Sequence, residues 1–250
     1  PDDPTSPYYR PYELLTRPQT NWMKEFTRMG NMQEYEINAS AGNDKGKFYT
    51  SLAYQENEGI VEQSSFKKFT ARVNSDYKLL PNLEIGTRVN LAYTDIHDSE
   101  MQSLYYSNPF FAGLTILPWT PLYDADGNYN VNIPENSNTN PLYNAFNDEQ
   151  YEKQYRVHGA MYLQWEPIKN LVIKTNNSVE GTFGEGIRYW GPDPGGATGT
   201  LQSSQLQYLQ LTTSNTITYN NMWGDHSFRV MVGQEAQRRT YHSFYAYAPS

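Results

Sequence analysis

Two long runs of alternating apolar and polar residues, joined by a very short turn, most constrain the fold of this chain. In the run from Phe69 to Leu79, every second residue is apolar or small, and the residues between are polar or charged. The pattern resumes from Leu83 to Tyr93, after Leu80–Asn82. A period of two is typical of a β-strand with one apolar and one polar face. The segment therefore predicts an antiparallel hairpin, whose apolar face contacts either a second sheet or lipid.

Similar alternation recurs along the chain and indicates about eight strands. One short helix is expected at Asn21–Phe26. The connections between strands alternate between short and long, as in an up-and-down meander whose short turns all lie at one end. The expected strands are 33–41, 48–55, 69–79, 83–93, 155–165, 171–183, 206–219 and a last one through Phe228, Val230 and Val232; the short turns are 42–47, 80–82, 166–170 and 220–226, and the long connections are 56–65, 96–150 and 184–200.

Strand length and aromatic placement favour lipid as the contact of the apolar face. Soluble strands have a mode of about 5–6 residues, whereas a tilted strand that crosses a membrane needs about 9–11. Lipid interfaces favour aromatic rings near strand ends. We expect an all-β fold: an antiparallel up-and-down transmembrane β-barrel segment with long extracellular loops. The rings near predicted strand ends are Phe69, Tyr77, Tyr93, Tyr155, Trp165, Phe183 and Tyr219.

A soluble β-sandwich or propeller remains the alternative, since its strands also alternate. Ser75, Asn177 and Asn215 fall on the apolar face, where lipid contact is unfavourable. A β-bulge that shifts the phase, a water-exposed strand end or a covering element would each explain them.

Composition narrows the classes of function. The net charge of −8 argues against a nucleic-acid partner, which requires a basic surface. The chain has no cysteine, so disulfides and thiolate metal sites are excluded. It contains no run of about 18 apolar residues, so no transmembrane helix is expected. The first residues have neither the basic nor the apolar region of a signal peptide, and we expect the chain to be an internal piece of a longer protein.

Several segments together resemble the barrel of SusC/RagA-type TonB-dependent outer-membrane transporters. The resemblance follows the family's order over nearly the whole chain. The segments that carry it are "NWMKEF" (21–26), "NMQEYEINASAGNDKGKFYTSLAYQENEGIV" (31–61), "FKKFTARVNSDYKLLPNLEIGTRVNLAYTD" (66–95), "PLYDADGNY" (121–129) and "HSFRVMVGQEAQ" (226–237).

The resemblance implies active uptake of oligosaccharides, or of peptides, across the outer membrane of a Gram-negative, Bacteroidetes-like cell. It implies a SusD-like surface lipoprotein and the TonB–ExbB–ExbD complex as partners, no cofactor and no enzymatic activity. Family barrels have about 22 strands. Residues 1–250 are therefore expected to form a partial barrel domain, and neither the plug domain nor the TonB box is visible in this sequence.

Two sets of candidate site residues follow. In a barrel, the polar alternates of the first hairpin would face the lumen, where they would meet plug, water or substrate. Aromatic residues in the long connections would stack on sugar rings, or alternatively pack the loops against each other or a partner. The lumen candidates are Arg72, Asn74, Asp76, Lys78, Glu84, Arg88 and Asn90, and the ligand-binding candidates are Tyr105, Tyr106, Trp119, Tyr123, Tyr189 and Trp190.

One motif admits a metal. Asp124, Asp126 and Asn128 occupy positions 1, 3 and 5 of a calcium loop, but Tyr129 stands where that loop requires glycine. The same residues also predict a tight hairpin turn. No catalytic residue is assigned. Two other functions stay open: an all-β surface glycan-binding module without transport activity, and a β-rich glycoside hydrolase.

Overall fold

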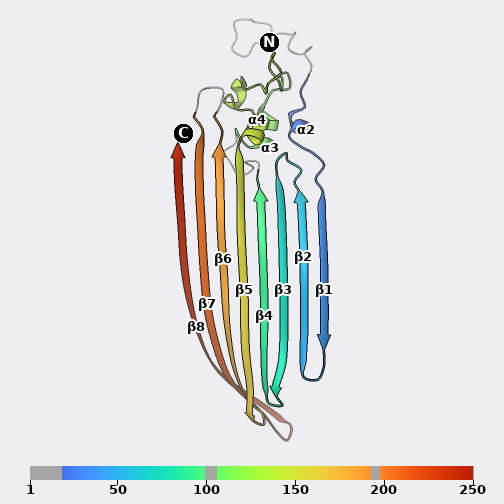
Figure 1. Ribbon diagram of the computed structural model, residues 1–250, viewed down its shortest axis with the longest axis vertical. Helices are drawn as coiled ribbons and strands as arrows, with labels where there is room; N and C mark the ends of the chain where they lie inside the picture. The colour runs from blue at the N-terminus through green and yellow to red at the C-terminus, as the bar shows by residue number, and fades with distance from the viewer. Residues whose placement is uncertain (1–18, 99–105, 193–197, 250) are drawn as a thin grey trace.

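The computed structural model describes residues 19–98, 106–192 and 198–249, and these form one antiparallel sheet of eight strands in sequence order. Short turns join the strands at one end of the sheet, and the longer connections lie at the other (Figure 1). The strands are β1 (Met32–Gly42), β2 (Gly46–Glu58), β3 (Ser65–Leu80), β4 (Leu83–His97), β5 (Glu149–Ile168), β6 (Leu171–Trp190), β7 (Thr200–Trp223) and β8 (His226–Pro249).

The predicted meander is confirmed, but most strands extend further toward the long connections than the alternation indicated. The loop predicted from Gly184 to Thr200 is wrong in its first part, because β6 continues to Trp190. Gly184 and Gly186 stay paired with β5 and β7. Hydrogen bonding to two neighbouring strands here outweighs the poor strand preference of glycine. Likewise, Glu56 lies in β2 and not in the predicted loop.

The register keeps the two faces of the sheet in phase across all eight strands. Val73 lies opposite Val89, and the row continues through Gly159, Val179 and Leu211 on the next three strands. Among the described strands, register shifts occur only beside the β3–β4 and β5–β6 turns. No bulge therefore explains Asn177 or Asn215, which share the apolar face with these residues.

No element covers the apolar face within the described part of the chain. Phe69, Leu91 and Leu211 are 46%, 43% and 47% exposed, although strand pairing surrounds each of them. Every buried apolar side chain of the described residues comes from outside the strands. A sandwich would bury this face against a second sheet; no such sheet is present among the described residues.

Two rows of side chains run across the strands on the apolar face, near the end with the long connections. The charged row lies closer to these connections than the aromatic row. The first row is aromatic and the second is charged, with the sign alternating from strand to strand. Between the charged row and the short turns, this face of β2–β6 carries no Asp, Glu, Lys or Arg. Membrane barrels have such an apolar band, about 25 Å tall and bordered by aromatic residues. The aromatic row is Tyr54, Phe69, Tyr93, Tyr155 and Phe183, and the charged row is Glu56, Lys67, Asp95, Lys153 and Glu185.

Strand stagger accounts for the polar residues of the apolar face on β7 and β8. The row that begins at Gly46, next to the β1–β2 turn, ends at Asn215 and Gln234. However, β7 continues to Trp223 before its own short turn. If all short turns lie at one membrane surface, Asn215 and Gln234 lie nearer the opposite surface, which favours the water-exposed explanation for Asn215.

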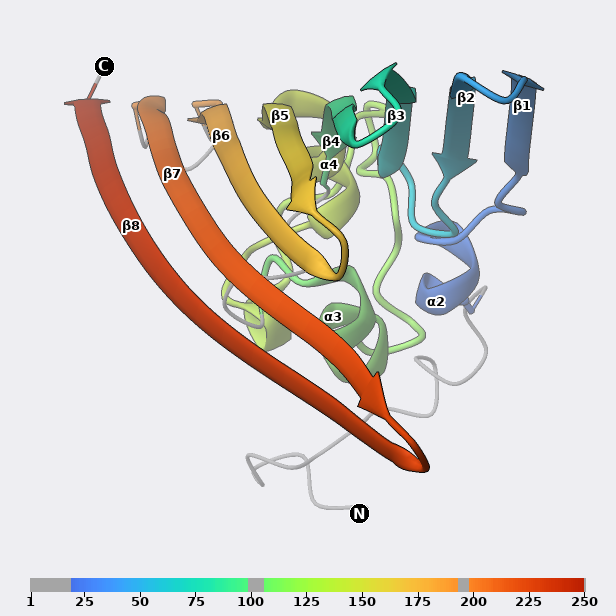
Figure 2. The same cartoon turned by 90° about the horizontal axis from the view of Figure 1, so that it is seen from below.

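Residues 19–31 and 106–148 form a small folded unit, here called the cap, at the end with the long connections. Region 96–150 was expected to be irregular, but Asn108 and Asn140 each cap a short helix whose first residue is proline. Figure 2 shows the cap helices on the hollow side of the curved, open sheet. The helices are α2 (Trp22–Glu25), α3 (Pro109–Thr115), η1 (Pro134–Asn136) and α4 (Pro141–Asn147).

The helices of the described residues all lack the length and hydropathy that a membrane-spanning helix requires.

The cap has its own apolar core. Trp22 and Phe26 confirm the helix expected at 21–26 and anchor it in this core. The core residues are Trp22, Phe26, Ala112, Ile116, Leu122, Ile133 and Leu142.

We predict that Val89→Arg, on the apolar face, lowers the free energy of unfolding in lipid vesicles by about 2–4 kcal/mol, because lipid does not solvate a guanidinium. Asn90→Arg, one residue further on the polar face, is the matched control and should change this free energy by less than about 0.5 kcal/mol. Urea titration of the vesicle-inserted protein measures both. Equal tolerance of the two substitutions would contradict lipid contact at Val89.

Candidate functional site

The polar face of the sheet is its inner, hollow side. Trp190 continues the polar alternation of β6, and Asp98 continues that of β4. Both side chains border a depression with Asn144 and Asp148 of the cap. Since the cap lies on the hollow side of the sheet, the polar face is the one that it overhangs (Figure 2).

All seven residues that were predicted to face a lumen share the polar face. Arg72 lies opposite Asn90, and Lys78 lies opposite Glu84. The register thus brings the seven side chains of β3 and β4 together on the face that was expected. Their role toward plug, water or substrate stays a prediction.

A charged cluster occupies the polar face near the short turns. Nη2 of Arg88 lies 2.7 Å from Oδ1 of Asp76. The hydroxyl of Tyr162 lies 2.8 Å from Oδ1 of Asp76 and 2.5 Å from Oε1 of Glu84, and it donates to one carboxylate at a time. The ammonium of Lys174 lies 4.3 Å from the centre of the Tyr162 ring. The cluster thus ties β3, β4, β5 and β6 together through side chains.

Gly86 makes room for this cluster. A Cβ atom at Gly86 would lie 2.0 Å from Cε1 of Tyr162 and 2.5 Å from Oδ1 of Asp76. The ring of Tyr162 therefore lies across the backbone of β4, where any other residue would push it away. Sequence reasoning missed Tyr162; the one available signal was a glycine in the polar phase of β4, since glycine inside a strand often marks a close approach.

A second group of candidate residues surrounds a depression of about 530 Å³ between the cap and the end of β6. Its lining combines side-chain amides with two aromatic rings. Amides both donate and accept hydrogen bonds, and rings bind apolar faces, which suits a polar ligand; Asp148 also lines the depression. These amides and rings include Asn132, Asn138, Tyr143, Asn144 and Trp190.

The loop that carries these amides contains two consecutive residues with strained backbone angles. Ser137 and Asn138 both have left-handed backbone angles, with φ of 54° and 57°. Asn136 is fully buried and donates to the carbonyl oxygens of Tyr106 and Thr139 at 2.9 and 2.8 Å. Strained residues that the surrounding structure holds in place are typical of ligand-binding loops.

The six predicted ligand-binding aromatics fall in different places. Tyr105 lies outside the described residues. Tyr106 and Trp119 lie in the cap connections. Tyr189 and Trp190 end β6 instead of lying in a loop, and they point to opposite faces of the sheet. The five described aromatic side chains therefore do not form one binding surface; Trp190 borders the depression between cap and sheet.

Tyr123 takes part in packing within the cap. Its ring stacks on Tyr129 with 5.3 Å between centroids, and Tyr129 stacks on Phe146 at 6.1 Å. Burial, reinforced by the neighbouring Tyr123, raises the pKa of Tyr129 above its usual value, so its hydroxyl stays neutral. This arrangement supports the packing interpretation of Tyr123.

The motif at Asp124 forms the predicted turn. Tyr123 and Tyr129 pair as an isolated antiparallel bridge, and Gly127 has a φ of 86°. Oδ1 of Asp124 accepts hydrogen bonds from the backbone N–H groups of Asp126 and Asn128, each at 2.9 Å. This turn geometry accounts for all three residues of the calcium-like pattern. Within the described ranges, no group of three His, Cys, Asp or Glu side chains is placed to hold a metal.

We predict that Gly86→Ala lowers the free energy of unfolding by about 1–3 kcal/mol, because the new methyl group displaces Tyr162 from its two carboxylate partners. Gly233→Ala is the control, since its Cβ would meet only ordinary contacts of 3.4 Å or more. In a Tyr162→Ala background, Gly86→Ala should cost little, and a double-mutant cycle in denaturant measures this coupling. Additive effects would contradict the contact.

We also predict that Asn136→Ala loosens the cap and leaves the sheet intact. Removing the amide leaves the carbonyl groups of Tyr106 and Thr139 without this donor, at a cost of about 1–3 kcal/mol. Hydrogen exchange should then accelerate over residues 106–148, while the strands exchange as before. Asn132→Ala, at an exposed position of the same loop, should leave exchange unchanged. Equal exchange in the two variants would refute the role of Asn136.

Proteins named as TonB-dependent receptors are similar to the chain in sequence. No family model matches it. TonB-dependent receptor P26 of Formosa agariphila is 25% identical over 84% of this chain, and TonB-dependent receptor P3 of the same organism is 25% identical over 88%. These alignments cover 20% and 23% of the two relatives, so the chain spans about a fifth of their length.

Solved structures share the fold. The RagAB peptide importer in its closed-closed state superposes with a TM-score of 0.81 and 19% identity, over 92% of this chain and 27% of that one. Its open-open state superposes with a TM-score of 0.77 and 17% identity, over 92% and 30%.

These similarities extend over most of the chain, as does the resemblance carried by the sequence segments. The predicted all-β meander and the outer-membrane location are both confirmed. Together with the apolar band and the charged inner face, they support the resemblance of the chain to part of the barrel of a SusC/RagA-type TonB-dependent transporter.

Proposed function

We propose that the protein takes up an oligomeric nutrient, an oligosaccharide or a peptide, across the outer membrane at the expense of energy delivered by TonB–ExbB–ExbD. One observation carries this proposal: strands β2–β6 have an uncovered apolar band without charged side chains on their outer side and charged side chains on their hollow side. Such a sheet is the wall of a water-filled passage through lipid.

Each face of the wall has a distinct task in this proposal. The apolar band contacts lipid and holds the protein in the membrane. On the inner face, Arg72, Asp76 and Arg88 keep water and polar groups in the lumen, since a charged lining is solvated by the water that fills the passage. The pairing of Asp76 with Arg88 leaves this part of the lining without a strong net field.

The cap is the proposed capture site. It overhangs the hollow side at the end with the long connections, which corresponds to the extracellular end in outer-membrane barrels. A surface lipoprotein of the SusD type would close this mouth from outside. In the depression between cap and sheet, Asn138 and Asn144 would bond hydroxyl or amide groups, and Trp190 would stack on a sugar ring or an apolar side chain.

A surface module that binds glycans without transport would use the same depression. The uncovered apolar face separates the two functions, because a water-soluble module would expose that whole face to water.

To test uptake, we predict that cells take up the labelled nutrient only while TonB is present. Trp190→Ala should weaken binding of this nutrient to the detergent-purified, full-length protein by about 3- to 10-fold, because the variant loses one stacking contact. Tyr189→Ala, one residue earlier on the opposite face, should bind as the native protein does. Calorimetry measures the affinities. Uptake that continues without TonB would contradict the proposed function.

A further inference from the structure

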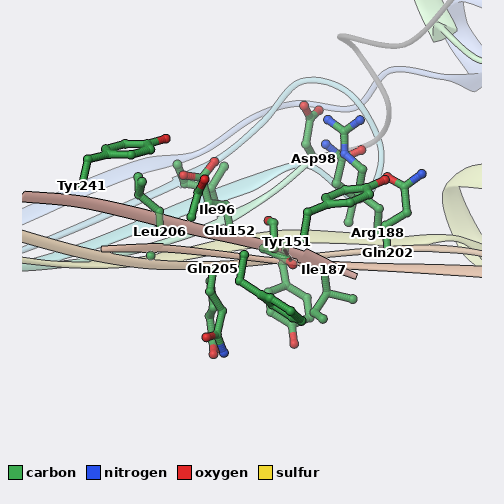
Figure 3. A pocket seen from close by; sticks show the side chains of 18 residues that line it. Ile96, Asp98, Tyr151, Glu152, Ile187, Arg188, Gln202, Gln205, Leu206 and Tyr241 are labelled. Carbon is green, nitrogen blue, oxygen red and sulfur yellow. Dashed lines mark hydrogen bonds between the residues drawn. The ribbon is translucent and has the colours of Figure 1, made fainter. Parts of the chain in front are cut away.

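A separate hollow of about 590 Å³ lies on the polar face of the sheet where β5–β8 approach the cap. This volume is within the usual range of small-molecule sites. Figure 3 shows Asp98, Glu152, Leu206 and Tyr241 on one side of the sheet and Tyr151, Gln205 and Ile187 on the other. The former side is the polar face, which also carries Arg188 and Gln202 by register.

Two glycines form the floor of this hollow. Gly184 and Gly186 are consecutive polar-face positions of β6, and Gly186 lies between Glu152 of β5 and Ser204 of β7. A Cβ atom at Gly186 would approach Oγ of Ser204 to 2.7 Å. Because both positions lack a side chain, they leave a recess that larger side chains surround. Both glycines lie in the part of β6 that the sequence had predicted to be a loop.

Several polar groups around the recess have unused hydrogen-bonding capacity. Arg188 makes no ion pair or side-chain hydrogen bond with any described residue. The amide side chains of Gln150 and Gln202 flank it in register on β5 and β7. Oδ1 of Asp98 is buried and has no hydrogen-bond partner among the described residues. A buried carboxylate oxygen without a donor costs free energy until a ligand supplies one.

The recess thus presents charges of both signs. A guanidinium binds a carboxylate through two parallel hydrogen bonds, and the neighbouring amides can bond the adjacent peptide group. Asp98 and Glu152 complement an ammonium or N–H donor. Tyr241, which also borders the recess, offers an apolar ring with a polar tip. A neutral sugar has no group that would pair with Arg188 as an ion.

We propose that this recess is a subsite for a short peptide with a free carboxylate, held by Arg188 at its carboxylate and by Asp98 and Glu152 at its donor groups. The proposal rests on the proposed function, in which the polar face lines the passage. Trp190 follows Arg188 on the same face of β6 and borders the cap depression. The two hollows therefore adjoin, and a ligand released from the cap reaches the recess next.

The test measures binding of four probes to the full-length protein in detergent by calorimetry: a tripeptide, its C-terminal amide, its N-acetyl form and a neutral trisaccharide. The free tripeptide should bind at least about tenfold more tightly than its amide, since the amide loses a charge-assisted pair. Arg188→Gln should abolish that difference, and Arg188→Lys should keep part of it. Arg156→Gln is the control, because Arg156 lies on the same face but outside the recess and bonds Gln154.

Asp98→Asn provides a second, independent arm, which should reduce the preference for the free tripeptide over its N-acetyl form. The proposal is overturned if the native protein does not distinguish the tripeptide from its amide, if Arg188→Gln and Arg156→Gln act alike, or if the trisaccharide binds more tightly than the tripeptide. TonB-dependent uptake without a preference for the free carboxylate would contradict the proposed subsite but not the proposed function. Carboxylate-selective binding without TonB-dependent uptake would contradict the proposed function but not the subsite.

Discussion

The unbroken register of the β-ladder is the constraint on which the rest of this structure depends. Because side chains alternate with a period of two, a slip of one residue in any strand would turn its charged set outward and its apolar set inward. The described strands keep phase over all eight, with irregular pairing confined to positions beside two short turns. Both the lipid-facing band and the charged inner lining result from this one property.

The distribution of burial differs from that of a water-soluble protein. Apolar side chains of the strands stay exposed, and the buried apolar residues of the described part cluster in the cap. The sheet is stabilised by its backbone hydrogen bonds, which lipid makes obligatory, and by side-chain contacts across the polar face such as those of Tyr162 with Asp76 and Glu84. The cap is stabilised in the ordinary way, by a small apolar core.

Much of the wall could be predicted from the sequence, because alternation is a local signal. The hairpin from Phe69 to Tyr93 and the face of Arg88 followed from period two alone. The extension of β6 through Gly184 and Gly186 could not be predicted, since pairing with two neighbours overrides local preference there. The helices at Asn108 and Asn140 were missed, although each has an asparagine followed by a proline. Their apolar residues are too few to show a helical period.

The position of Tyr162 over Gly86 depends on the pairing of two strands that lie far apart in sequence, so no local pattern could reveal it. The same limit applies to the recess around Arg188 and to the depression beside Trp190. Both hollows combine residues of several strands or of strand and cap, and only the register brings these residues together.

The separate core of the cap has a consequence for evolution. Trp22, Ile133 and Leu142 pack with one another, whereas the strands contribute no residue to that core. Mutations in the cap can therefore alter its surface without disturbing how the wall inserts into lipid, and mutations in the wall are constrained by lipid on one side and water on the other. Substitutions and insertions in the cap would therefore leave the register and the packing of the wall unchanged.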